Sequence, residues 1–86
     1  KNSLALADFN EAIRLDRDNH VLYFYRAYFH DALGNYELAI QDQTQALDLI
    51  PDNDTTGKPY MYNNRAITYW NMGNIQKLLM ISIEHL

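Results

Sequence analysis

The sequence predicts an all-α fold of helix–turn–helix units that repeat along the chain, with about five helices in total. One observation is a block of sequence that recurs in register 34 residues later. A second is that apolar side chains within each block recur at three- and four-residue steps, which is the period of one helix face. A third is a pair of Gly-Asn dipeptides, Gly34–Asn35 and Gly73–Asn74, each of which comes after a helical block. Glycine and asparagine are typical of the residues between two helices.

Two pairs of segments carry the repeat. Ala5–Asn19 (ALADFNEAIRLDRDN) aligns with Ala39–Asn53 (AIQDQTQALDLIPDN), with Ala, Asp, Ala, Leu, Asp and Asn identical at matching places. Leu22–Asn35 aligns with Met61–Asn74 at an offset of 39 residues. Because the second offset is about five residues longer than the first, we expect an insertion at 54–58 between the copies.

Capping residues set the expected limits of the first helices. Asp18 or Asn19 is expected to cap a helix that runs from about His20 to Leu33, because short polar side chains accept hydrogen bonds from the free N–H groups there. Gly34 is expected to end this helix, since the left-handed turn after a helix costs glycine least. Asn35 is then expected to cap a third helix.

Two prolines and a second glycine set the limits in the other half. Pro51 comes after the third helix, because a residue without an N–H cannot continue a helix interior. Pro59 suits the first turn of a fourth helix. Gly73 is expected to close that helix and Asn74 to open a fifth. A longer loop is therefore expected at 51–58.

Composition excludes several classes of function. The net charge is −4 and the seven basic residues are scattered, so no patch for nucleic acid is expected. No apolar run approaches the roughly 20 residues of a membrane span, so no membrane partner is expected either. The chain has no cysteine, which excludes disulfides and fits a reducing compartment. Without a signal peptide at its start, we expect a cytoplasmic protein.

Catalytic chemistry has little support in the sequence. His20, His30 and His85 lie far apart, and no metalloprotease, phosphate-loop or nucleophile-elbow motif is present. We therefore expect a protein that is not an enzyme, with no catalytic residues, no cofactor and no metal.

The 34-residue helix–turn–helix unit resembles the tetratricopeptide repeat. The first helix of that repeat carries an aromatic residue, then Leu-Gly, then Tyr. Tyr62, Arg65, Ala66 and Tyr69 keep those spacings, with Arg in place of Leu and Ala in place of Gly. The second helix carries two alanines with an aromatic between them, and a proline after its end. The matching residues are Ala5, Phe9 and Ala12 in one copy and Ala39, Ala46 and Pro51 in the other, with Gln43 at the aromatic place.

The resemblance covers nearly the whole chain. It implies a short right-handed α-solenoid forming a single domain, 1–86, within a longer protein. The expected divisions are a half repeat at 1–19, a full repeat at 20–53, the insertion at 54–58 and a repeat at 59–86.

Departures from the family pattern occur at both ends. Arg17 stands where the first proline is expected. In the last helix, Leu78 and His85 replace the two alanines and Ser82 replaces the aromatic, so the final pair is expected to pack less closely. That helix is apolar almost all round, whereas a terminal repeat needs a polar outer face. We therefore expect either that more repeats follow in the longer protein or that another copy covers this helix in a homo-oligomer.

Family members bind peptides on the inner wall that the first helices of the repeats form. The resemblance therefore implies a protein–protein interaction scaffold with a concave groove. Carried over to this sequence, the groove residues are Val21, Phe24, Tyr28, Asp31, Tyr60, Asn63, Asn64, Ile67 and Trp70.

An aromatic stripe can instead belong to the core. Core packing is the favoured interpretation for Tyr23, Tyr62 and Tyr69, which keep the family's packing places. For Phe24, Tyr28 and Trp70, both interpretations stay open.

Some family members bind the carboxylate end of a peptide through basic residues on this wall. Asn64 matches one of their asparagines, but the basic places hold Phe24 and Tyr60. We therefore expect an apolar or aromatic peptide or protein segment as the partner, not a charged C-terminal tail.

Two arginines and two aspartates recur at matching places in the repeats. We expect Arg26 and Arg65 to form structural ion pairs with Asp8 and Asp42, because a guanidinium group binds a carboxylate in a planar, two-bond geometry. The alternative is four separately solvated charges.

Overall fold

A computed structural model describes the backbone of residues 1–84. The side chains of residues 77, 78 and 81–84 are outside the described part. The expectations for Leu78, Ser82 and His85 therefore lie outside the described residues.

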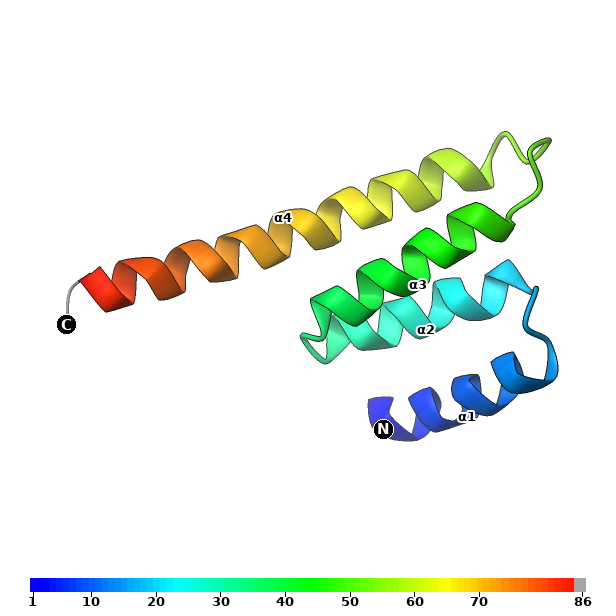
Figure 1. Cartoon of the computed structure of the whole chain (residues 1–86), viewed down its shortest axis with the longest axis horizontal. Helices are drawn as coiled ribbons and strands as arrows, with labels where there is room; N and C mark the ends of the chain where they lie inside the picture. The colour runs from blue at the N-terminus through cyan, green and yellow to red at the C-terminus, as the bar shows by residue number, and fades with distance from the viewer. Residues whose placement is uncertain (85–86) are drawn as a thin grey trace.

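Four helices make up the described chain: α1 (Asn2–Leu15), α2 (His20–Ala32), α3 (Tyr36–Leu49) and α4 (Gly57–Glu84). Consecutive helices run in opposite directions, so that α2 and α4 run the same way (Figure 1). α2 packs against α1 and α3, and α3 packs against α4. The all-α prediction of paired helices joined by short turns is confirmed.

The structure has four helices where about five were predicted, because α4 continues through Gly73 and Asn74 as a single helix of 28 residues. The matching pair at the end of α2 does form a turn. Gly34 has φ +78°, its N–H donates to the carbonyl of Asp31, and the N–H of Asn35 donates to the carbonyl of His30. These two hydrogen bonds satisfy carbonyls at the end of α2 and reverse the chain.

The residues downstream of each Gly-Asn pair account for the difference. After Gly34, α3 returns along the bundle and buries Ala39 and Ala46 completely, as expected for small residues that allow close helix approach. At the corresponding places after Gly73, the sequence has Leu78 and His85. A returning helix with these larger residues would pack less closely, while a glycine inside a continuous helix costs only about 1 kcal/mol. The same dipeptide therefore forms a turn in one copy and lies within a helix in the other.

The equivalent aromatic places of the two copies also differ. Tyr23 is half-buried against the core, as expected. Tyr62 and Tyr69 were expected in the core as well, but they are 54% and 51% exposed. No returning helix from the described residues covers that face of α4, which explains why these two side chains are in solvent.

The apolar core lies where α2, α3 and α4 meet. Its buried members are Ala46, Leu47, Ile50 and Met61, with Tyr23 and Phe24 packed against them. The core therefore fixes the separation between α2 and α4.

The α3–α4 connection is shorter than expected, since α4 begins at Gly57 and includes residues that were assigned to the insertion. Asp54 Oδ1 accepts hydrogen bonds from the N–H groups of Gly57 at 2.7 Å and Thr56 at 3.2 Å, which satisfies free donors at the helix start. A Cβ atom at Gly57 would lie 2.7 Å from Ile50 Cδ1, so glycine allows this close approach. Pro59 lies in the first turn of α4, as expected.

Side-chain caps are confirmed at one turn and not at the other. Asn19 accepts a hydrogen bond from the N–H of Val21 at 3.0 Å, as expected of the cap of α2. Asn35 stands at the start of α3 without a side-chain cap, which corrects the expectation for that residue. At the first turn, where Arg17 replaces the family's proline, the Tyr23 hydroxyl donates to the Arg17 carbonyl at 2.9 Å.

Candidate functional site

A cleft of about 450 Å³ lies between α2 and α4, with α3 contributing one residue. A cleft of this size is within the range of small-ligand and side-chain binding sites. Its lining residues are Phe24, Tyr25, Tyr28, Asp31, Gln43, Tyr60, Asn64 and Ile67.

Most residues of the predicted groove line this one cleft. They are Phe24, Tyr28, Asp31, Tyr60, Asn64 and Ile67. Val21, Asn63 and Trp70 do not line it. Trp70 is 70% exposed and lies at a separate shallow pocket with Tyr69, near Gly73 and Asn74. The described chain has no returning fifth helix to cover the face of α4 that carries Trp70.

Aromatic rings form the walls of the cleft. The rings of Phe24 on α2 and Tyr60 on α4 have centroids 5.7 Å apart and link the two helices. Phe24 is half-buried against the core, whereas Tyr28 and Tyr60 are 65% and 59% exposed. One wall residue is thus held by the core, and two present much of their rings to solvent.

Buried polar side chains connect the three helices beneath these walls. Gln43 Nε2 on α3 donates to Thr68 Oγ1 on α4 at 2.9 Å. The Thr68 hydroxyl lies 3.2 Å from Asp31 Oδ2 on α2 and 3.2 Å from the Asn64 carbonyl, so it can donate to either. Thr68 is fully buried and Gln43 is 6% exposed.

Gln43 and Thr68 were not among the predicted groove residues, although Gln43 lines the cleft and Thr68 binds Gln43 beneath it. The signal for Gln43 was its position, where the family pattern has an aromatic residue. Thr68 lies one turn after Asn64 on the same face of α4, so helix periodicity could have placed it near the groove.

One atom in this polar group has no hydrogen-bond partner. Gln43 Oε1 is buried and accepts no hydrogen bond from the described residues. A buried acceptor left unsatisfied costs about 1–3 kcal/mol, so polar contacts at this place matter for stability and for binding.

Comparison with known protein families bears on the repeat seen in the sequence and in the helices. Residues 9–41, which span the end of α1, all of α2 and the start of α3, match the family described as Tetratricopeptide repeat. This match supports the tetratricopeptide repeat family for the chain. Among curated proteins, it is similar to the Protein SGT1 homolog of Homo sapiens, with 39% identity over 51 residues. That match covers 59% of this chain and 14% of the human protein, so the chain spans a small part of its relative. No solved structure matches the chain.

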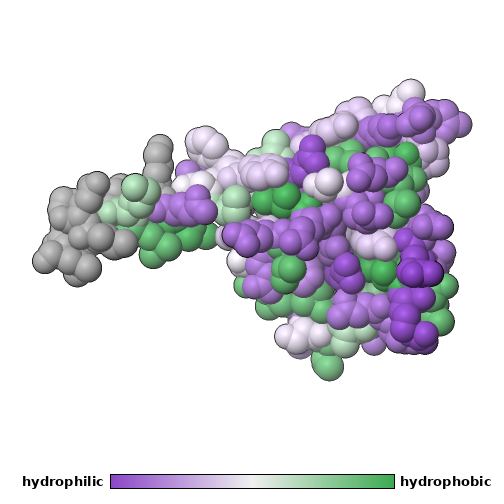
Figure 2. Space-filling model, in the orientation of Figure 1, coloured by the Kyte–Doolittle hydropathy of each residue, from purple (hydrophilic) through white to green (hydrophobic). Residues whose placement is uncertain are grey.

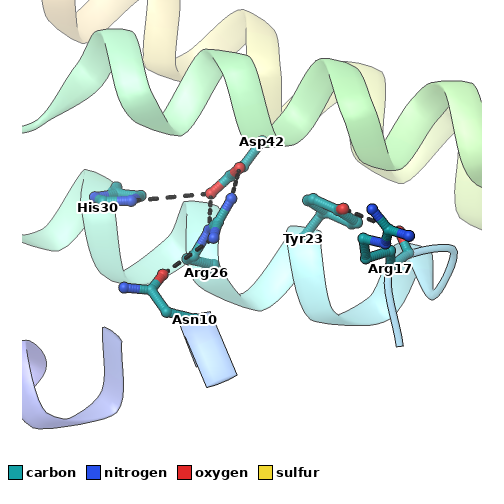
Figure 3. Close-up of polar contacts among 6 residues, drawn as sticks. All are labelled: Asn10, Arg17, Tyr23, Arg26, His30 and Asp42. Carbon is teal, nitrogen blue, oxygen red and sulfur yellow. Dashed lines mark hydrogen bonds and ion pairs between the residues drawn. The ribbon is translucent and has the colours of Figure 1, made fainter. Parts of the chain in front are cut away.

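In this tetratricopeptide repeat, an ion pair joins the two helices of the central unit (Figure 3). Arg26 Nε lies 2.7 Å from Asp42 Oδ2, and Arg26 Nη2 lies 2.7 Å from Asp42 Oδ1. This hydrogen bond with Asp42 raises the pKa of Arg26 above its usual value, with desolvation opposing the shift. Asn10 on α1 also accepts a hydrogen bond from Arg26, at 3.0 Å.

The other two members of the predicted charge pattern do not form ion pairs with the described residues. Arg65 donates to the Thr44 hydroxyl at 2.9 Å, and Asp8 is exposed. Asp42 is already bound by Arg26 on α2, which explains why Arg65 on α4 contacts a hydroxyl instead. The expected set of pairs is thus corrected to the single pair of Arg26 and Asp42.

Both copies of the repeat contain a contact between an arginine and the tyrosine three residues before it. The guanidinium carbon of Arg26 lies 5.6 Å from the Tyr23 ring centroid, and that of Arg65 lies 5.4 Å from the Tyr62 ring centroid. Both distances are within the range of cation–π contacts. The arginines that replace the family's leucine therefore retain a packing role through their side-chain planes.

Within the described residues, no group of three or more His, Cys, Asp or Glu side chains is arranged to hold a metal ion. No described helix has the length and apolar character needed to cross a bilayer.

Proposed function

We propose that the chain is a non-catalytic scaffold for protein–protein interaction that binds a peptide or protein segment in the cleft between α2 and α4. Residues 9–41 match the tetratricopeptide repeat family, whose members are protein-interaction modules. The observation that carries the proposal is an open cleft walled by exposed aromatic side chains, Tyr28 and Tyr60, and anchored on the core by Phe24.

The energetic argument starts from the exposed rings. An apolar patch in a small domain marks a binding surface when it is contiguous and concave. Aromatic side chains bury a large area and have few rotamers to lose, so they dominate the binding energy of many interfaces. Because α2 and α4 are both fixed by α3, the cleft needs little rearrangement to accept a ligand.

The residues in the cleft favour an apolar or aromatic segment over a charged C-terminal tail. Phe24 and Tyr60 occupy the places of the basic residues with which some relatives bind a terminal carboxylate, and the two rings contact each other. A carboxylate placed there would meet two aromatic rings in place of a cation, and the charged residue in the lining of the cleft, Asp31, is itself acidic. This argues for a protein partner with apolar side chains.

Selection from a library of random-sequence peptides against the immobilised 86-residue chain tests the proposal. The affinity of the selected peptides is then measured by calorimetry for the Tyr28→Ala, Tyr60→Ala double variant. The matched control is the Tyr69→Ala, Trp70→Ala double variant, which removes two exposed aromatic residues of α4 outside the cleft. We expect the first variant to lose binding and the control to keep it. Equal affinities for both variants would place the binding surface elsewhere.

A second candidate function is self-association through the end of α4. This part of the helix projects beyond the other three (Figure 1). It carries exposed apolar side chains, with Ile75 43%, Leu79 60% and Met80 64% exposed. In the coloured part of this segment, Figure 2 shows hydrophobic surface beside hydrophilic surface. Pairing of two such segments would remove this surface from water.

Solution mass distinguishes this second candidate from a monomeric scaffold. Light scattering after gel filtration is expected to give a dimer for the unmodified chain and a monomer for a Leu79→Lys, Met80→Lys variant. A monomer for the unmodified chain at micromolar concentration would contradict self-association and leave the cleft proposal unaffected.

A further inference from the structure

Asp31 is the charged residue of the cleft, and its hydrogen-bonding capacity is largely unused. Its Oδ2 lies 3.2 Å from the Thr68 hydroxyl, and it forms no ion pair with the described residues. A carboxylate has sites for about four hydrogen bonds. Other acidic side chains of the chain do have cationic partners: Glu11 pairs with Arg14, Asp42 with Arg26 and Asp52 with Lys58.

The other groups around Asp31 also favour a positive ligand. Among the described residues, no lysine, arginine or histidine lines the cleft. Gln43, which lines it beside Asp31, uses its amide N–H on Thr68 and leaves its oxygen without a donor. Tyr28 and Tyr60 line the cleft and are exposed, and the face of an aromatic ring carries negative electrostatic potential that attracts cations. The cleft thus combines one carboxylate with aromatic faces, and its described lining has no positive charge.

We propose that the cleft accepts a basic side chain, lysine or arginine, of the bound peptide, with Asp31 as its counter-ion and the ring of Tyr28, one turn before Asp31 on α2, against its stem. This inference rests on the proposed function, because it specifies the ligand of the same cleft. The long apolar stem of a basic side chain packs on aromatic walls while its charged head reaches the carboxylate. The partner is then an apolar segment that contains a basic residue.

The test uses the peptides selected against the unmodified 86-residue chain and three variants. Asp31→Asn removes the charge but keeps a side-chain oxygen that can accept the Thr68 hydrogen bond. Asp48→Asn, at an exposed place on α3, is the control with the same net charge. Asp31→Glu retains the carboxylate. In each selected peptide, the basic residue is also replaced by citrulline when it is arginine, or by acetyl-lysine when it is lysine, which removes its charge.

We expect a basic residue in the selected peptides and binding at least about fivefold weaker for Asp31→Asn, because a charge-assisted contact is lost. Asp48→Asn should bind as the unmodified chain does, and Asp31→Glu should bind more tightly than Asp31→Asn. The charge-neutral peptide should bind the unmodified chain and Asp31→Asn equally. The inference is overturned if cleft-binding peptides lack basic residues, or if Asp31→Asn and Asp48→Asn bind alike, while the proposed function stands. If no selected peptide depends on Tyr28 and Tyr60, the proposed function itself fails.

Discussion

Arg26 and Asp42 form a two-bond ion pair between α2 and α3, with both N–O distances at 2.7 Å. The Asp42 side chain is 8% exposed and that of Arg26 is 22% exposed, so the pair is mostly shielded from water. The planar guanidinium fits the carboxylate in a way that a lysine cannot. The pair therefore adds a directed polar contact between two helices that also meet through the apolar core.

Removal of one partner should destabilise the chain more than removal of a surface charge. For Asp42→Ala we expect a loss of about 2–3 kcal/mol in the free energy of unfolding. This is less than the cost for a completely buried pair, because the Arg26 side chain is partly exposed to solvent. Asp8→Ala, at the matching place in α1, should change it by less than about 0.5 kcal/mol. Urea denaturation measures both, and equal effects would show that the pair contributes little.

The two Gly-Asn pairs offer a direct test of the four-helix arrangement. Gly34 has φ +78°, so Gly34→Ala should cost about 1–2 kcal/mol. Gly73 lies inside α4 with nothing within 4 Å of an added Cβ, so Gly73→Ala should stabilise the chain by about 0.5–1 kcal/mol. Thermal unfolding checks both signs. Destabilisation by Gly73→Ala would mean that Gly73 forms a turn after all.

Two equivalent alanines also differ between the copies, one packed against a neighbouring helix and one not. Ala27 on α2 is 1% exposed, whereas Ala66, its equivalent on α4, is exposed. Ala27→Leu should therefore lower the free energy of unfolding by about 1–3 kcal/mol through overpacking. Ala66→Leu should change it by less than about 0.5 kcal/mol. A comparable loss in both variants would indicate that a helix covers Ala66 in solution.

Much of this fold was predictable because the repeat appears twice in the sequence. Several features depend only on residues that are close in the sequence, so the sequence predicts them. These are the helix periods, the cap of α2 at Asn19 and the left-handed conformation of Gly34. The behaviour of Gly73 was not readable, because an identical dipeptide forms a turn only when the next helix packs well enough to favour the reversal. Tertiary packing decides between the two outcomes.

The cleft was predictable in part for the same reason. Phe24, Tyr28, Asp31, Tyr60, Asn64 and Ile67 share faces that helix periodicity defines. The buried polar contact between Gln43 and Thr68 joins residues 25 positions apart on different helices, so no local pattern indicates it. Which of the several aspartates pairs with Arg26 likewise depends on how α2 packs against α3.

Thr68 should prove important for stability although its side chain is small. Thr68→Val keeps the shape but leaves Gln43 Nε2 without its acceptor and Asp31 without its donor. We expect a loss of about 1–3 kcal/mol in the free energy of unfolding. Thr55→Val, in the exposed α3–α4 connection, is the control and should have little effect. Denaturant unfolding with unchanged midpoints for both variants would show that water replaces these hydrogen bonds without cost.

Chemical-shift mapping of a selected peptide on the ¹⁵N-labelled chain tests the central claim most directly, because it locates the binding surface without any substitution. If the α2–α4 cleft binds the peptide, the amide signals of Tyr28, Gln43 and Asn64 should shift with increasing peptide, while those of the outer residues of α1 stay in place. Shifts confined to the projecting end of α4, with the cleft signals unchanged, would contradict it.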